Sequence, residues 1–205
     1  MRLALLALLA GLAVAVALGG RLANVPGERL RWPSLTFVAV LLYWAPALLG
    51  ATSSAAAVLI LFSYAALLAF ALANLRLTGM AVVGLGLALN ASVILANGGM
   101  PVDPSAVVAT GLVRPDELLV IELGPGRQWL GPDDHLAVLG DIVPVAVLDE
   151  VVSFGDLVLA AGLANVAFRL LRPAAGRRSS GSFRRHGRRL WSSAGFSTGP
   201  WAPAG

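Results

Sequence analysis

Five long apolar runs, separated by short polar joints, determine the solvent in which this chain can fold. Hydrophobic residues make up 58% of the 205 positions and charged residues only 13%, whereas a water-soluble domain carries roughly 25% charged residues. A helix of about 20 apolar residues crosses a bilayer core, and an open strand in lipid would leave backbone groups unpaired. The sequence therefore predicts an all-α membrane protein with five transmembrane helices, at about residues 3–19, 34–49, 54–75, 79–96 and 154–171.

Arginine placement predicts the orientation of these helices. Arginines fill the first connection, the third connection at Arg76, and the tail after the last run, while the other side carries Arg2, Arg114, Arg127 and most of the acids. Positively charged loops tend to stay in the cytoplasm, so we expect the N-terminus outside and the C-terminus inside. In the alternative, Ala-Val-Ala at 15–17 is the cleavage site of a signal peptide, and four helices remain.

Cysteine and histidine counts limit the chemistry. The chain has no cysteine and two histidines, which excludes a disulfide frame, a thiolate metal site and a multi-histidine zinc site. We therefore expect no metal and no cofactor, although His135 with Asp134 or Asp141 is a weak alternative metal site.

Residues 97–153 form the only long segment between the runs, and we expect it to fold on the outer side. The segment is rich in acids and in Gly and Pro turn signals. Residues 118–123 fit a short strand or an interfacial stretch. Residues 136–148 are apolar apart from Asp141 and are interrupted by Pro144. Because this stretch is too short to span a bilayer, we expect a re-entrant or interfacial segment.

Three sequence blocks carry a family resemblance. They are Leu-Asn-Ala-Ser-Val-Ile at 89–94 with Asn-Gly-Gly-Met-Pro-Val at 97–102, His135 with Leu-Gly-Asp-Ile at 139–142, and Ser-Phe-Gly-Asp at 153–156. Over about residues 1–172, the chain resembles an uncharacterised family of bacterial integral membrane proteins, domain of unknown function 5317. The resemblance implies a multi-pass protein of the bacterial cytoplasmic membrane, but it implies no reaction.

Two asparagines and the glycines beside them are candidate pocket residues. Asn90 and Asn97 are seven residues apart, so they share one face of a helix. A buried amide among membrane helices needs a partner. One interpretation is an interhelical hydrogen bond together with a helix end at Asn97, Gly98 and Gly99. The other places both amides at the rim of a polar pocket.

Two carboxylates and a histidine complete the candidate site. Asp156 follows Ser153 by three residues, which fits a helix cap, yet a carboxylate at the edge of hydrocarbon also indicates function. Asp141 stands alone in an apolar stretch and needs a partner, for which Asp156, Asn90, Asn97, His135 and Arg127 are the candidates. His135 fits either a solvated loop or the pocket. We predict one outer pocket lined by Asn90, Asn97, His135, Asp141 and Asp156.

The tail, residues 173–205, is predicted to be a disordered, arginine-rich cytoplasmic segment that follows a membrane domain of residues 1–172. Its basic residues are expected to contact anionic lipid headgroups rather than nucleic acid: Arg177, Arg178, Arg184, Arg185, Arg188 and Arg189.

Three functions remain open from the sequence. The first is a small binding or assembly protein without catalysis, in a single copy or as a homo-oligomer. The second is an intramembrane hydrolase that uses Asp141 and Asp156 as a pair. This layout is similar to lipoprotein signal peptidases, but the chain has five predicted helices rather than four and lacks an arginine after Asp141. The third is a small transporter component, for which no inverted repeat is visible.

Overall fold

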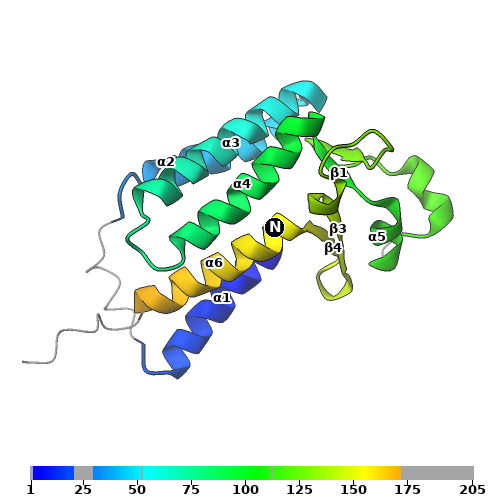
Figure 1. The fold of residues 1–205 in the computed structure, drawn as a ribbon. Helices are drawn as coiled ribbons and strands as arrows, with labels where there is room; N and C mark the ends of the chain where they lie inside the picture. Colours follow the sequence, from blue (N-terminus) through cyan, green and yellow to red (C-terminus); the bar gives the residue numbers. More distant parts are fainter. Residues whose placement is uncertain (1, 21–29, 52, 112, 172–205) are drawn as a thin grey trace, which may run out of the picture. The chain divides into compact units, whose positions relative to one another are not determined.

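The computed structural model describes residues 2–20, 30–51, 53–111 and 113–171 (Figure 1). The side chains of Ser53 and Leu119 are outside this description. So is the predicted tail with its six lipid-contacting arginines, and those predictions therefore stay predictions.

Each of the apolar runs forms a helix close to the predicted range. The helices are α1 (Arg2–Ala17), α2 (Ser34–Leu49), α3 (Ser53–Ala73), α4 (Met80–Asn97) and α6 (Phe154–Leu171). In the described part of the chain, three of them, α3, α4 and α6, are long and apolar enough to cross a membrane. Helices α1 and α2 have 16 residues each, or about 24 Å at 1.5 Å per residue, which is shorter than a typical bilayer core. The three long helices indicate a membrane protein.

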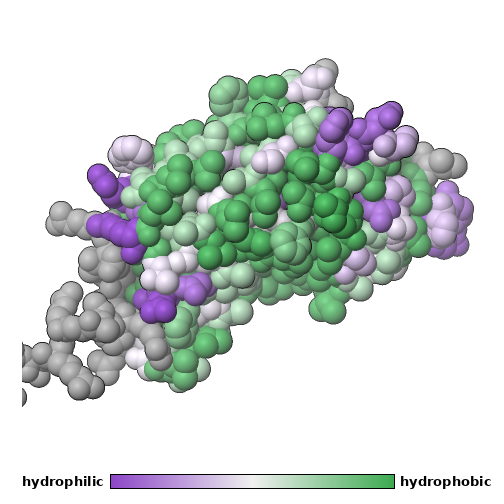
Figure 2. All heavy atoms as spheres, in the orientation of Figure 1, coloured by the Kyte–Doolittle hydropathy of each residue, from purple (hydrophilic) through white to green (hydrophobic). Residues whose placement is uncertain are grey.

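Most of the surface of these helices is apolar. Figure 2 shows hydrophobic residues over the helices on one face, with hydrophilic residues near the helix ends. Phe37, Phe62 and Leu95 are each at least 60% exposed. Side chains of this kind on a helix surface are stable in lipid and costly in water.

The prediction of an all-α chain is wrong for the segment between α4 and α6, which contains a four-stranded sheet. Its strands are β1 (Met100–Val102), β2 (Arg127–Trp129), β3 (Asp141–Val145) and β4 (Glu150–Ser153), in the order β2-β1-β3-β4. Strand β1 is parallel to both neighbours, and β3 with β4 is an antiparallel hairpin. The segment also holds helix α5 (Pro104–Ala109) and three 3-10 turns, η2 (Pro115–Val120), η3 (Ala137–Leu139) and η4 (Ala146–Leu148).

Two local predictions in this segment need correction. The strand expected at residues 118–123 is absent, because the 3-10 turn η2 occupies residues through Val120 and no strand follows before Arg127. Residues 136–148 are not re-entrant, since β3 forms their centre and pairs with β4. The interfacial alternatives for both stretches stay predictions. Pro144 is tolerated there because the pairing of β3 with β1 is at Asp141 alone, so Pro144 lies where β3 has only one neighbouring strand.

Helices α4 and α6 pack together, and glycines lie where the two helices cross. A Cβ at Gly86 would lie 2.6 Å from the backbone nitrogen of Leu159, and a Cβ at Gly162 would lie 2.6 Å from that of Val83. Small residues at a helix crossing let two backbones approach closely. This close approach brings the C-terminal half of α4 against the first turn of α6.

Helix α1 lies along the other side of α6 (Figure 1). Gly11 is buried against the backbone of Ala164. At its N-terminal end, the backbone N–H groups of Arg2 and Leu3 donate to the carboxylate of Glu150 at 3.0 and 3.3 Å. The carboxylate satisfies backbone donors that a helix start leaves without partners. This contact ties the start of the first helix to the hairpin.

Candidate functional site

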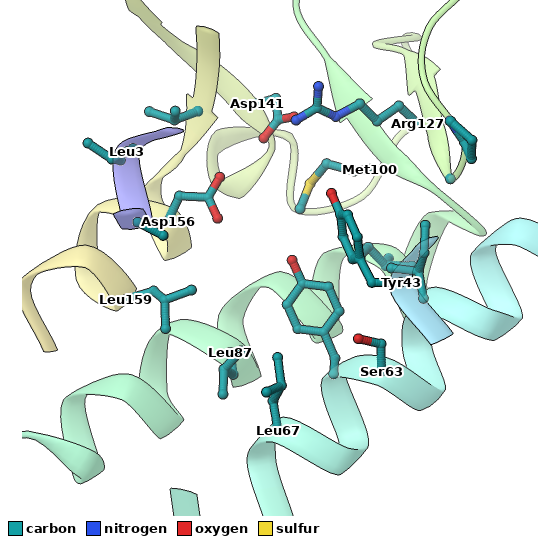
Figure 3. Close-up of a pocket in the computed structure, with 17 residues that line it drawn as sticks. Leu3, Tyr43, Ser63, Leu67, Leu87, Met100, Arg127, Asp141, Asp156 and Leu159 are labelled. Atoms are coloured by element: carbon teal, nitrogen blue, oxygen red, sulfur yellow. The ribbon is translucent and has the colours of Figure 1, made fainter. Parts of the chain in front are cut away.

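A cavity of about 140 Å³ lies where the sheet meets the ends of the helices. Figure 3 shows Arg127, Asp141 and Asp156 on one side of this space and Leu67, Leu87 and Leu159 on the other. Its polar lining residues come from α2, α3, α6, the start of β2 and the start of β3: Tyr43, Ser63, Tyr64, Arg127, Asp141 and Asp156. The cavity therefore joins a charged rim to an apolar floor.

Asp156 is held by the start of its own helix. Its backbone N–H donates to Oγ of Ser153 at 2.9 Å, and its Oδ2 accepts from the backbone N–H of Ser153 at 3.2 Å. This is a reciprocal helix cap of the kind predicted from the spacing. Its Oδ1 accepts from Nδ2 of Asn90 at 2.7 Å, so both oxygens of Asp156 already have donors.

Asn90 links α4 to this cap. The residue is fully buried, and its Oδ1 accepts from Oγ of Ser153 at 2.9 Å. Its Nδ2 also lies 3.4 Å from the hydroxyl of Tyr64, at the long end of hydrogen-bond distances. Gly155 packs directly on the Asn90 side chain, where a Cβ would collide with it. Asn90 thus supports the carboxylate of Asp156 without lining the cavity itself.

The carboxylate of Asp141 is not held by hydrogen bonds from the described residues, in contrast to that of Asp156. Its side chain is 1% exposed, and Nη2 of Arg127 lies 3.0 Å from Oδ2. That contact is close but not aligned as a hydrogen bond, and neither carboxylate oxygen has a hydrogen-bond partner in the described residues. A buried acceptor without a donor is costly. The carboxylates of Asp141 and Asp156 point toward the same space (Figure 3).

Burial raises the pKa of Asp141 to about 7, against the lowering effect of the Arg127 guanidinium and with a further raising effect from Asp156. Arg127 itself begins β2, directly after the turn Gly-Pro-Gly at 124–126, and its side chain is 42% exposed. The pair is therefore asymmetric, because the acid is buried while the base reaches solvent at the rim.

The other predicted pocket residues lie outside this cavity. Nδ2 of Asn97 donates to the backbone oxygen of His135 at 2.8 Å, and its Oδ1 accepts from the backbone N–H of His135 at 2.7 Å. Gly98 ends α4 in the left-handed region at φ 72°, and Gly99 packs against Gln128. These residues therefore join the end of α4 to the segment that follows it. This agrees with the first of the two interpretations, in which Asn97, Gly98 and Gly99 form a helix end.

Tyr43, Ser63 and Tyr64 line the cavity, and none of them is among the pocket residues predicted from the sequence. The available signal was the pair Ser63 and Tyr64 in the middle of an apolar run. Arg127 had appeared only as one of several candidate partners of Asp141. Among the described residues, no three His, Asp or Glu side chains come together as a metal site would require.

One known protein family matches most of this chain. A family of unknown function, DUF5317, matches residues 28–168. The chain belongs to this family. In this DUF5317 protein the matched range includes every residue that lines the cavity except Leu3 and Ala4, whereas α1 lies outside it, so the match is shorter than the resemblance implied. No curated protein and no solved structure matches the chain.

Proposed function

We propose that this DUF5317 protein is a five-span protein of the bacterial cytoplasmic membrane, and that its outer cavity binds a small polar group that carries hydrogen-bond donors. The N-terminus lies outside and the tail inside. The bonds from Arg2 and Leu3 to Glu150 support a shared side for the start of α1 and the segment between α4 and α6, and the arginine placement supports the choice of the other side as the cytoplasmic one. Helices shorter than the bilayer core are accommodated by local thinning.

The observation that carries the binding function is the buried carboxylate of Asp141, which is ion-paired with Arg127 but has no hydrogen-bond donor among the described residues. A carboxylate is an acceptor only, with room for about four donors, and this one lines a cavity while no described residue donates a hydrogen bond to it. Among the described residues that line the cavity, Asp141 and Asp156 carry the acidic groups and Arg127 is the one basic side chain. A cavity of about 150 Å³ holds a molecule the size of benzene, so the group is small. An ammonium with N–H donors fits this combination of charge, donor need and size.

The test compares two cations of equal charge. Ethylammonium has N–H donors and tetramethylammonium has none. In detergent-solubilised protein, we expect ethylammonium to raise the thermal midpoint and tetramethylammonium to leave it unchanged. The Asp141→Asn variant should lose the response, while Asp133→Asn, an exposed carboxylate of the same segment, should keep it. Equal responses to both cations, or a response that survives Asp141→Asn, would count against the proposed site.

A second candidate function, hydrolysis by the two aspartates, draws on one observation. Asp141 and Asp156 line the same cavity, and a pKa of about 7 for Asp141 suits a group that exchanges a proton at neutral pH. The two donors already held by Asp156 weigh against it. In a host that lacks the gene, hydrolysis predicts that Asp141→Asn and Asp156→Asn each abolish the phenotype at normal protein abundance. Binding alone predicts that Asp156→Asn mainly lowers abundance, since it weakens the helix cap.

A further inference from the structure

A second hollow lies on the lipid side of the same helices. It is a groove of about 420 Å³ between α3 and α4, and it is lined almost wholly by apolar side chains: Val58, Leu61, Phe62, Tyr64, Ala65, Leu68, Ala91 and Leu95. Phe62 and Leu95 are 60% and 69% exposed. Both helices are long enough to cross a membrane, so in a bilayer this groove faces hydrocarbon.

The groove and the polar cavity share one lining residue, Tyr64. Along α3, Ile60, Ser63 and Leu67 line the cavity, whereas Leu61, Ala65 and Leu68 line the groove. Tyr64 lines both spaces, and its hydroxyl lies beside Asn90 on the cavity side. An apolar groove next to a charged cavity is complementary to a molecule that is itself apolar at one end and charged at the other.

We infer that the ligand is a membrane phospholipid with a primary-amine head group, which puts its head in the cavity and one acyl chain in the α3–α4 groove. This inference rests on the proposed function and specifies its ligand. The charges of the lining match a zwitterionic head. Asp141 and Asp156 face the ammonium, and the guanidinium of Arg127, which is 42% exposed at the rim, faces the phosphate, a group that arginine binds well.

The choice of a primary amine over a quaternary one follows from Asp141. No residue in the described ranges donates a hydrogen bond to its two oxygens, and a primary ammonium supplies three N–H donors, whereas a trimethylammonium supplies none and is larger. A site built to accept such donors discriminates against an analogue without them, because its polar groups then stay unpaired. Head-group selection and chain binding are therefore separable by experiment.

The test uses three probes in native mass spectrometry of the detergent-solubilised full chain. They are lysophosphatidylethanolamine, lysophosphatidylcholine with the same acyl chain, and glycerophosphoethanolamine, which has the head but no chain. We expect the first to bind at least about tenfold more tightly than either of the others, a ratio that corresponds to about 1.4 kcal/mol. Asp141→Asn should remove the preference for ethanolamine over choline.

Two alanine variants of α3 test the groove. Ala65 and Ala55 are both exposed, and only Ala65 lines the groove. Ala65→Leu should weaken lysophosphatidylethanolamine binding at least about fivefold and leave glycerophosphoethanolamine unaffected, while Ala55→Leu should change neither. Exposed positions are chosen so that both variants fold, which thermal unfolding checks.

The outcomes separate this inference from the proposed function. If glycerophosphoethanolamine binds as tightly as the lysolipid, and Asp141→Asn abolishes both, the cavity site stands and the lipid inference is overturned. If lysophosphatidylcholine binds equally well, the head-group assignment is overturned. If Ala65→Leu changes the oligomeric mass and not lipid binding, the groove is a protein interface and the inference also fails. If neither glycerophosphoethanolamine nor ethylammonium binds, both the lipid inference and the proposed function are overturned.

Discussion

The side-chain amide of Asn90 donates a hydrogen bond of 2.7 Å to the carboxylate of Asp156. This bond joins the outer part of α4 to the first turn of α6. Since Asn90 is fully buried and also accepts from Ser153, the two carboxylate oxygens and the amide are all satisfied within one network. Such a network fixes the geometry of neighbouring elements more strongly than its separate bonds suggest, and here it fixes one wall of the cavity.

Asn90→Ala should destabilise the protein by about 1–3 kcal/mol, because it leaves Ser153 and Asp156 without buried partners. Thermal unfolding in detergent measures the loss. The matched control is Ser92→Ala on the same helix, whose exposed hydroxyl bonds only to the backbone of Ala88. A near-neutral Asn90→Ala variant would contradict the network described above.

Asp141 should make stability fall as pH rises. Its pKa is about 7 in the folded chain and 3.8 ordinarily, so the folded state binds the proton more tightly. The resulting stabilisation is full below about pH 4 and is lost as pH rises toward about 7, by roughly 1.4 kcal/mol per unit of pKa difference. Comparing the thermal midpoints of the wild type and Asp141→Asn from pH 4 to pH 8 isolates this contribution. A constant difference across that range would refute it.

Gly86→Ala should separate α4 from α6. A Cβ at this position lies 2.6 Å from the backbone nitrogen of Leu159, which cannot move aside without shifting the helix. Gly84→Ala on the same helix meets only side-chain atoms at 3.7 Å, and it should be neutral or gain up to about 1 kcal/mol of helix propensity. Unfolding midpoints and protein abundance distinguish the two. Equal effects would mean that α4 and α6 do not cross closely at Gly86.

Helix α1 should remain in the mature protein. Gly11 and Ala15 are buried, and the start of the helix bonds to Glu150 and to the backbone oxygen of Leu148. A signal peptide that is removed after Ala17 would take these contacts with it. Intact mass spectrometry of the protein purified from its membrane decides the matter, since a chain that begins at Leu18 would contradict this prediction.

Single cysteines in this cysteine-free chain test the orientation. Val147 is 93% exposed in the hairpin turn, and Thr78 is exposed in the α3–α4 connection. In intact cells, a membrane-impermeant maleimide should label Val147→Cys and not Thr78→Cys, while permeabilised cells should show both labelled. The reverse pattern would invert the proposed topology.

The structure of residues 136–148 and the contact between Asp141 and Arg127 could not be predicted in full from the sequence, whereas the long helices and one helix cap could. The long helices were predictable to within a few residues, because twenty apolar residues in a row have one stable conformation in lipid. The cap at Ser153 and Asp156 was predictable from its spacing. The sheet was not, since β1 and β2 have three residues each and carry no periodic signal of their own.

Hydropathy is a local property, so the sequence by itself determined which segments are helices and that lipid is the natural medium of α3, α4 and α6. The tertiary structure alone decided which polar side chains meet. Arg127 reaches Asp141 because β1 pairs with β2 on one side and with β3 on the other, and this register joins residues far apart in the chain. Asn97 and His135 instead bond to each other beside the end of α4 at Gly98, and neither lines the cavity.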